Sequence, residues 1–327
     1  MIVEDIINNP YGKGNDTLYD LCSGDFKLHK LQNNDESKDT LAAQLWLIGR
    51  AYAASPERRN YNLKQIIRSK IRNNNISDKR LDKIVELQSS GDGLDTFFDN
   101  LAKRLLKKYN SNSGFELDKN VSNNQPYNYD SQNINSGNQS DIKKLKKSIT
   151  CVLDFNLFIR DCIFEIDKEY FKKIPQLPEL QGLEITIDEK DLKDLKNNQN
   201  NILSFCSKFL HFHYPNTVFI MDSITKSHFK RKDTKYKFTF SGIEENFEID
   251  DMYSDVNTFV STFINDRYSS VEEKEKNKKQ IDIEKEYIRH CAREYILATY
   301  IYNKDDFGDR YVPRIIDTFM LKANSNT

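Results

Sequence analysis

The stretch "SFCSKFLHFHYPNTVFIMDSI", residues 204–224, sets the expectations for both the fold and the site. Helical spacing over 201–213 gathers the aromatic side chains on one side of a helix, together with His213. Lys208 and His211 fall on a separate stripe, so both side chains can face one cleft. The alternative is an amphipathic core helix whose lysine reaches solvent and whose histidines are satisfied core groups.

An aspartate ends the apolar part of this stretch, because "TVFIM" leads directly to Asp222. The carboxylate can cap a helix that begins at "SITKSHF". It can also lie in a partly dry pocket, where its charge acts strongly. The two roles are compatible.

Composition excludes several classes of protein. The chain has 327 residues, 38 % of them hydrophobic and 30 % charged, which is typical of an ordinary globular protein with one large or two small domains. The net charge is −1, so nucleic-acid binding requires local basic patches. Only 11 glycines occur, with no GxGxxG and no GxxxxGK[ST], which argues against dinucleotide-binding and P-loop folds.

Cysteine spacing and hydropathy predict the compartment. The five cysteines are scattered and form no CxxC, which indicates reduced thiols rather than disulfides or a metal site. Neither a signal peptide nor a run of 18 apolar residues is present. We therefore expect a cytoplasmic protein without membrane contact, cofactor or metal, while the oligomeric state stays open.

Helical periodicity dominates the rest of the chain and predicts an all-α fold with at most one or two short strands. The clearest predicted helices cover 39–59, 93–109, 201–213, 253–268 and 277–302. We predict an N-terminal helical lobe over 1–109 and a C-terminal helical lobe over 141–327, which contains the candidate catalytic segment 201–224.

Residues 110–140 are mostly Asn, Ser, Gln, Gly and Asp. Such a segment buries little apolar surface to offset its ordering entropy, so we predict a flexible linker or long loop between the lobes. The alternative is an Asn-rich insertion without a function.

Two basic regions are candidate contacts for nucleic-acid phosphates. The stretch "KSHFKRKDTKYK" (226–237) carries six Lys and Arg against one Asp, and residues 50–108 carry fourteen against seven Asp and Glu. A solvated charged face is the alternative. The candidate phosphate ligands are Arg50, Arg58, Arg59, Lys226, Lys230, Arg231 and Lys232.

Two further stretches are candidates for substrate binding. "LWLIGRAYAASPERR" holds the only tryptophan, Trp46, among small residues that allow a ligand or another helix to approach closely. "YIRHCAREY" places Tyr287 and His290 on one helical stripe with Arg293 adjacent, and "PRIIDT" supplies Arg314 and Asp317. A tight helix crossing and a buried ion pair are the respective alternatives.

The segment "SKFLHFHYPNTVFIMDSI" resembles the core of helix-hairpin-helix base-excision DNA glycosylases, over a short part of the chain. In that family a helix leads through a loop to an apolar "P-[VI]-D" or "V-D-[ST]-H" that ends in the catalytic aspartate. The resemblance implies a helical two-lobe architecture with a cleft, Asp222 as the catalytic aspartate and Lys208 near the nucleophilic lysine of bifunctional members. The family's glycine hairpin, "LPGVG", is replaced here by "LKNNQNNILS".

The resemblance implies an enzyme that flips a modified base out of double-stranded DNA and excises it. More distantly, the chain is similar to small bacterial phage-defence proteins with an "SK.LH…P…F.I.D" core, which suggests anti-phage defence as the setting. Substrate contacts are expected from His211, His213, Trp46, Tyr287, His290 and Arg293. The main alternative is a nucleic-acid-binding or regulatory helical module without catalysis. A nuclease or toxin ranks lowest, because neither an Arg-to-His signature nor a carboxylate cluster occurs.

Overall fold

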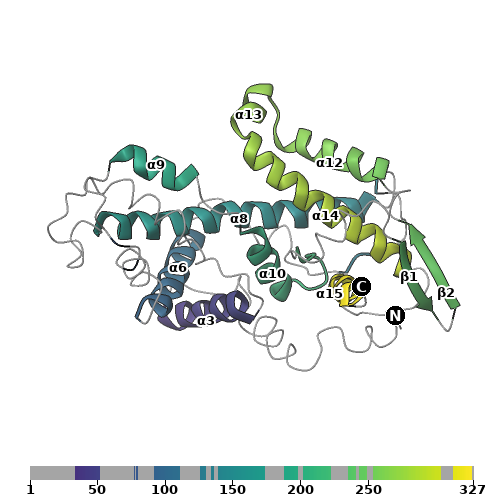
Figure 1. Ribbon diagram of the computed structural model, residues 1–327, viewed down its shortest axis with the longest axis horizontal. Helices are drawn as coiled ribbons and strands as arrows, with labels where there is room; N and C mark the ends of the chain where they lie inside the picture. The colour runs from purple at the N-terminus through teal and green to yellow at the C-terminus, as the bar shows by residue number, and fades with distance from the viewer. Residues whose placement is uncertain are drawn as a thin grey trace. The chain divides into compact units, whose positions relative to one another are not determined.

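A computed structural model provides the structure and describes residues 34–51, 77, 79, 92–110, 126–129, 134–135, 139–173, 188–197, 202–221, 235–240, 243–248, 253–302 and 312–325. Most of these residues are helical (Figure 1). The helices are α3 (Asp35–Ala51), α6 (Asp92–Asn110), α8 (Gln139–Lys173), α9 (Glu189–Asn197), α10 (Leu203–His213), α12 (Tyr253–Arg267), α13 (Val271–Lys276), α14 (Lys278–Tyr302) and α15 (Val312–Ser325).

One antiparallel hairpin accompanies the helices within these residues. Strand β1 (Lys235–Phe240) pairs with β2 (Ile243–Glu248), in a register from Lys235↔Glu248 to Phe240↔Ile243. The prediction of a mainly helical fold with at most two short strands is confirmed. None of the described helices is long and apolar enough to cross a membrane.

Packing divides the chain into two compact units that are discontinuous in sequence. Among the described residues, unit 1 holds 126–154 and those from Cys206 onward, and unit 2 holds the remainder, including α3, α6 and α9. The division falls inside α8 and α10. The predicted lobes 1–109 and 141–327 follow sequence order instead, and they stay a prediction.

The core of unit 2 contains an apolar stripe of α3. Leu41, Leu45 and Ile48 recur at helical spacing and are at most 1 % exposed. Helix α3 packs on α6, whose Phe98 and Leu101 are equally buried. The two helices were predicted from the sequence, whereas their contact with each other comes from the structure.

The core of unit 1 contains part of the segment expected to be a flexible linker. Tyr127 and Tyr129 are 2 % and 0 % exposed, and the ring of each lies within 6 Å of the ring of Tyr295 on α14. The buried carboxylate of Asp141 accepts hydrogen bonds from the amides of Asn128 and Tyr129, at 2.8 and 3.0 Å. Residues 126–129 have neither helix nor strand, yet two aromatic rings supply apolar surface that the average composition hides. The linker or long loop over 110–140 stays a prediction.

Candidate functional site

Residues 217–221, between α10 and the predicted catalytic aspartate, form an irregular segment in the core of unit 1, in which Thr217 ends a turn and 218–221 belong to no helix or strand. All five residues are at most 5 % exposed, and the part of the chain that the structure describes contains no strand paired with them. Buried backbone groups without partners are costly. Side chains of other elements supply these partners instead, and we call 217–221 the clamped segment.

Helix α10 holds the clamped segment at two points. His211 Nδ1 lies 2.7 Å from the carbonyl oxygen of Val218. The amide of Met221 donates to Ser207 Oγ at 3.0 Å. Because Ser207 and His211 are one turn apart on α10, they reach different points of a chain that runs alongside that helix.

Helix α14 holds the two carbonyl groups between these points. Tyr287 Oη donates to the carbonyl of Phe219 at 3.3 Å, and His290 Nε2 lies 2.7 Å from that of Ile220. Tyr287 and His290, which the sequence analysis names as expected substrate contacts together with His211, therefore lie at the clamped segment. His211, Tyr287 and His290 meet the same buried segment, each through a backbone carbonyl.

Two hydroxyl groups hold the start of the clamped segment, one on α8 and one in the chain just before α8. Ser148 Oγ and Tyr127 Oη both donate to the carbonyl of Thr217, each at 2.8 Å. The sequence analysis did not single out these two residues or Ser207. Tyr127 could have been identified as an aromatic residue within an Asn-rich stretch. A serine inside a helix has no feature in the sequence that predicts such a contact.

Burial fixes the protonation state of His211. The side chain is 0 % exposed, and this burial lowers the pKa of its imidazole to about 3. The hydrogen bond to Val218 opposes the shift, while the positive charge of Arg314 adds to it. His211 is thus neutral at pH 7 and carries its proton on Nδ1, because the Val218 carbonyl can only accept.

A buried group of ionisable side chains on α14 and α15 lies beside this histidine. His290 Nε2 is 3.2 Å from Glu294 Oε1, and Arg314 donates to Asp317. Burial raises the pKa of Glu294 to about 7, against the opposing charge of His290. Burial alone would lower the pKa of His290, but the Glu294 carboxylate outweighs it and the net pKa is raised. Both shifts keep a proton on the pair near neutral pH.

We expect a Glu294→Gln variant to gain stability relative to the parent protein as the pH rises. The folded pKa of Glu294 lies above its unfolded value of 4.5, so its contribution is fully present below pH 4.5 and is lost as the pH rises through about 7. A shift of this size corresponds to at most about 3 kcal/mol. Urea unfolding of both proteins at about pH 5 and about pH 8 measures the difference. An equal difference at the two pH values would contradict the shift.

The other described candidates of unit 1 are also buried. Lys208, His213 and Arg293 are 3 %, 2 % and 4 % exposed. The ring of His213 lies 4.7 Å from that of Phe209, centroid to centroid. The alternative of a helix whose lysine reaches solvent does not fit Lys208, because its side chain is buried. The predicted site roles of these three residues stay predictions.

The remaining candidates are not placed with the clamped segment. Trp46 belongs to unit 2, where its side chain is 41 % exposed and lines a pocket. The other predicted site residues lie outside the described residues, either entirely or in their side chain, and their roles stay predictions. These are Asp222, Arg50, Arg58, Arg59, Lys226, Lys230, Arg231 and Lys232.

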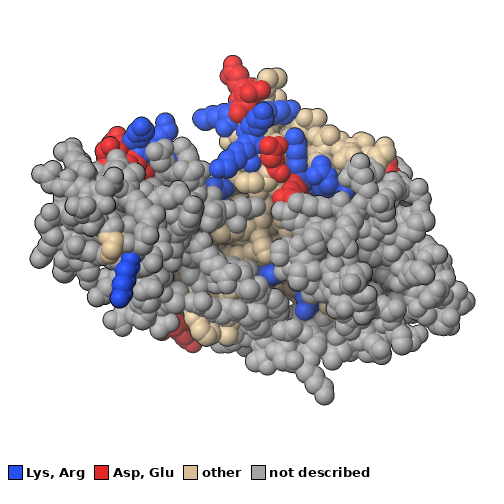
Figure 2. Space-filling model, viewed as in Figure 1, with Lys and Arg blue, Asp and Glu red and all other residues tan. Residues whose placement is uncertain are grey.

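Charged side chains of both signs alternate on the described surface. In Figure 2, Lys and Arg stand beside Asp and Glu around α13, where Glu272 and Glu273 precede Lys274 and Lys276. This surface is therefore not a uniform basic face. Within the described residues, no group of three or more His, Cys, Asp or Glu side chains is arranged to hold a metal ion.

Comparison of the chain with known protein families, with curated proteins and with solved structures finds no match.

Proposed function

We propose that the chain is a DNA glycosylase-like enzyme that excises a flipped, modified base, with Asp222 as its catalytic carboxylate. The clamped segment carries this proposal. It ends at Met221, one residue before Asp222, and side chains of α8, α10 and α14 hold it. Catalytic groups need support from packed, hydrogen-bonded neighbours to keep a productive geometry, and the clamped segment is support of this kind.

The proposed reaction is hydrolysis of the bond between the sugar C1′ and the base. The bond breaks with its electron pair on the base, and positive charge develops on the sugar as an oxocarbenium ion. The Asp222 carboxylate stabilises this charge and orients a water molecule. The water oxygen bonds to C1′ and one of its protons ends on the released base, which leaves an abasic site.

The burial of Lys208 bears on two proposed roles, which are contact with a DNA phosphate and nucleophilic attack on the sugar. With 3 % of its surface exposed, its amine is poorly placed to meet phosphates of the DNA backbone. An amine inside the protein can instead act as a nucleophile on a sugar carbon that is brought to it. In that case the amine bonds to C1′ as the C1′–base bond breaks, and the base leaves with the electron pair and a proton from the amine. The C1′–O4′ bond then opens, O4′ takes a proton from water, and the resulting protonated imine links Lys208 Nζ to C1′ of the DNA.

Incubation of the full chain with DNA duplexes that carry natural and phage-modified bases tests the proposed function. Released base, detected by mass spectrometry, is the expected result for at least one modification. Borohydride in a parallel reaction traps the imine if Lys208 attacks C1′, and a Lys208→Ala variant should then give no covalent adduct. The proposal fails if no duplex loses a base and none acquires an abasic site.

We expect DNA binding to weaken with salt and to depend on the basic stretch 226–237. Glutamate substitutions at Lys230, Arg231 and Lys232 should lower the slope of log affinity against log salt by about one for each lost phosphate contact. Fluorescence anisotropy with a labelled duplex measures this slope. The matched control places glutamate at Lys274, Lys276 and Lys278 on the mixed-charge surface, and an equal loss of affinity there would contradict a specific contact.

A further inference from the structure

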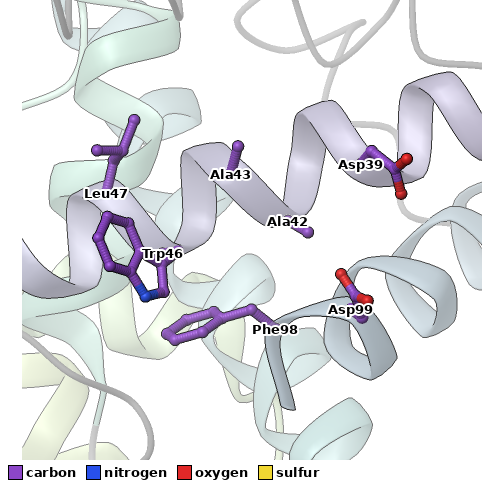
Figure 3. A pocket seen from close by; sticks show the side chains of 7 residues that line it. All are labelled: Asp39, Ala42, Ala43, Trp46, Leu47, Phe98 and Asp99. Atoms are coloured by element: carbon purple, nitrogen blue, oxygen red, sulfur yellow. The ribbon is translucent and has the colours of Figure 1, made fainter. Parts of the chain in front are cut away.

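A pocket in unit 2, independent of the clamped segment, lies between α3 and α6. Its volume is about 580 Å³, within the range of small-molecule sites. Figure 3 shows the rings of Trp46 and Phe98 at one end and the carboxylates of Asp39 and Asp99 at the other, with Ala42 between them. The lining also includes Ala43 and Leu47.

The aromatic end of the pocket presents part of an indole ring to solvent. Trp46 is 41 % exposed, whereas Phe98 below it is 1 % exposed and fixed in the core. An indole ring in this position can receive a flat ring or an alkyl chain on its face. The face of an indole is also the aromatic surface that attracts cations most strongly.

The carboxylates at the acidic end of the pocket favour a positively charged ligand. Asp39 and Asp99 come from different helices and both are exposed. Lys38, a neighbour on α3, forms a hydrogen-bonded ion pair with Asp39 at 3.1 Å. The bond to Asp39, with smaller contributions from Asp35 and Asp99, raises the pKa of Lys38. The field at this end therefore already favours the protonated form of an amine.

The local charge stays negative after this pairing. Three carboxylates, those of Asp35, Asp39 and Asp99, act on the single ammonium group of Lys38, which leaves a net charge of −2 among these four groups. An anionic ligand such as a nucleotide is repelled by such an arrangement, and a neutral ligand gains nothing from it. A cation gains from the carboxylates and from the indole face together.

We propose that this pocket binds a small organic cation, an ammonium group carried on an aromatic or alkyl body. The body lies against Trp46 and Phe98, and the ammonium group lies between Asp39 and Asp99. The proposal does not rest on DNA glycosylase activity, and each can fail without the other.

Tryptophan fluorescence of the full chain tests the proposal, because Trp46 is the only tryptophan. The probes are phenethylammonium, its neutral analogue phenethyl alcohol and the anion phenylpropionate. We expect a saturable change with the ammonium compound, an affinity at least about tenfold lower for the alcohol, and no saturation with the anion. Absence of saturation with the ammonium compound, or equal affinity for the alcohol, would overturn the proposal.

Two variants assign the binding to the acidic end. Asparagine at both Asp39 and Asp99 should lower affinity for the ammonium compound about tenfold, whereas Asp282→Asn, an exposed substitution in unit 1, should leave it unchanged. Lys38→Gln should raise affinity, since it removes the competing ammonium group. Unchanged affinity in the double variant, with helical content retained by circular dichroism, would overturn the assignment.

Discussion

Replacement of Asp222 by asparagine is expected to slow base release at saturating DNA by about a hundredfold or more. Asparagine keeps the shape of the side chain and much of its ability to cap a helix, but it removes the negative charge. Electrostatic stabilisation of a charged transition state is often worth about 3 kcal/mol or more. Single-turnover measurement of released base under excess enzyme gives the rate of the chemical step.

The affinity of this variant for DNA separates catalysis from binding. We expect it to be equal to or tighter than that of the parent, because a carboxylate that faces a polyanion is removed. Asp188→Asn, at an exposed aspartate just before α9, is a matched control and should keep the full rate. Full activity of the Asp222→Asn protein would end the glycosylase proposal and favour a binding module without catalysis.

Lowering the pH is expected to reduce the free energy of unfolding of the parent protein strongly, because His211 is buried in its neutral form. Its folded pKa of about 3 lies below the unfolded value of 6.5, so the stabilisation is complete above pH 6.5 and is lost as the pH falls toward 3. A shift of this size corresponds to about 5 kcal/mol over that window. A His211→Gln variant has an amide that can still donate to the Val218 carbonyl and has no group that titrates in this range.

Urea unfolding at about pH 7 and about pH 4 measures the effect in both proteins. The parent should lose about 3 kcal/mol more than His211→Gln between these values, because each pH unit below 6.5 costs about 1.4 kcal/mol. The change in unfolding free energy from pH 7 to pH 4 is taken for each protein separately. The effect of the substitution on stability at pH 7 therefore does not enter the comparison. A parallel decline of the two proteins would show that His211 is not buried in its neutral form.

Long periodic helices were the most predictable part of the fold. The predicted ranges 93–109, 253–268 and 277–302 differ from α6, α12 and α14 by at most one residue at each end. Their apolar positions recur at a period that only a helix brings to one face, so local sequence suffices. The hairpin of β1 and β2 was not predicted at its position. "KYKFTF" alternates and is followed by Ser-Gly, but its lysines were assigned to phosphate binding instead.

The hydrogen bonds that hold the clamped segment could not be predicted from the sequence. Helical spacing places Tyr287 and His290 on one stripe, and it places His211 on α10, but it does not give the partner of any of these polar groups. The partners are backbone carbonyls brought close by tertiary packing, and a carbonyl has no signature in the sequence. The same holds for Ser148, whose hydroxyl meets Thr217 from 69 residues away.

Amide hydrogen exchange at Met221 tests most directly whether side chains hold the clamped segment in place before DNA binds. The amide of Met221 donates to Ser207 Oγ in the core, at 3.0 Å. In the parent we expect it to exchange only through global unfolding. In Ser207→Ala it should exchange faster, while the amide of Val218, bonded to the carbonyl of Tyr214, stays protected. Exchange of the parent's Met221 amide at the rate of an unstructured chain would contradict a segment that is held ready for catalysis.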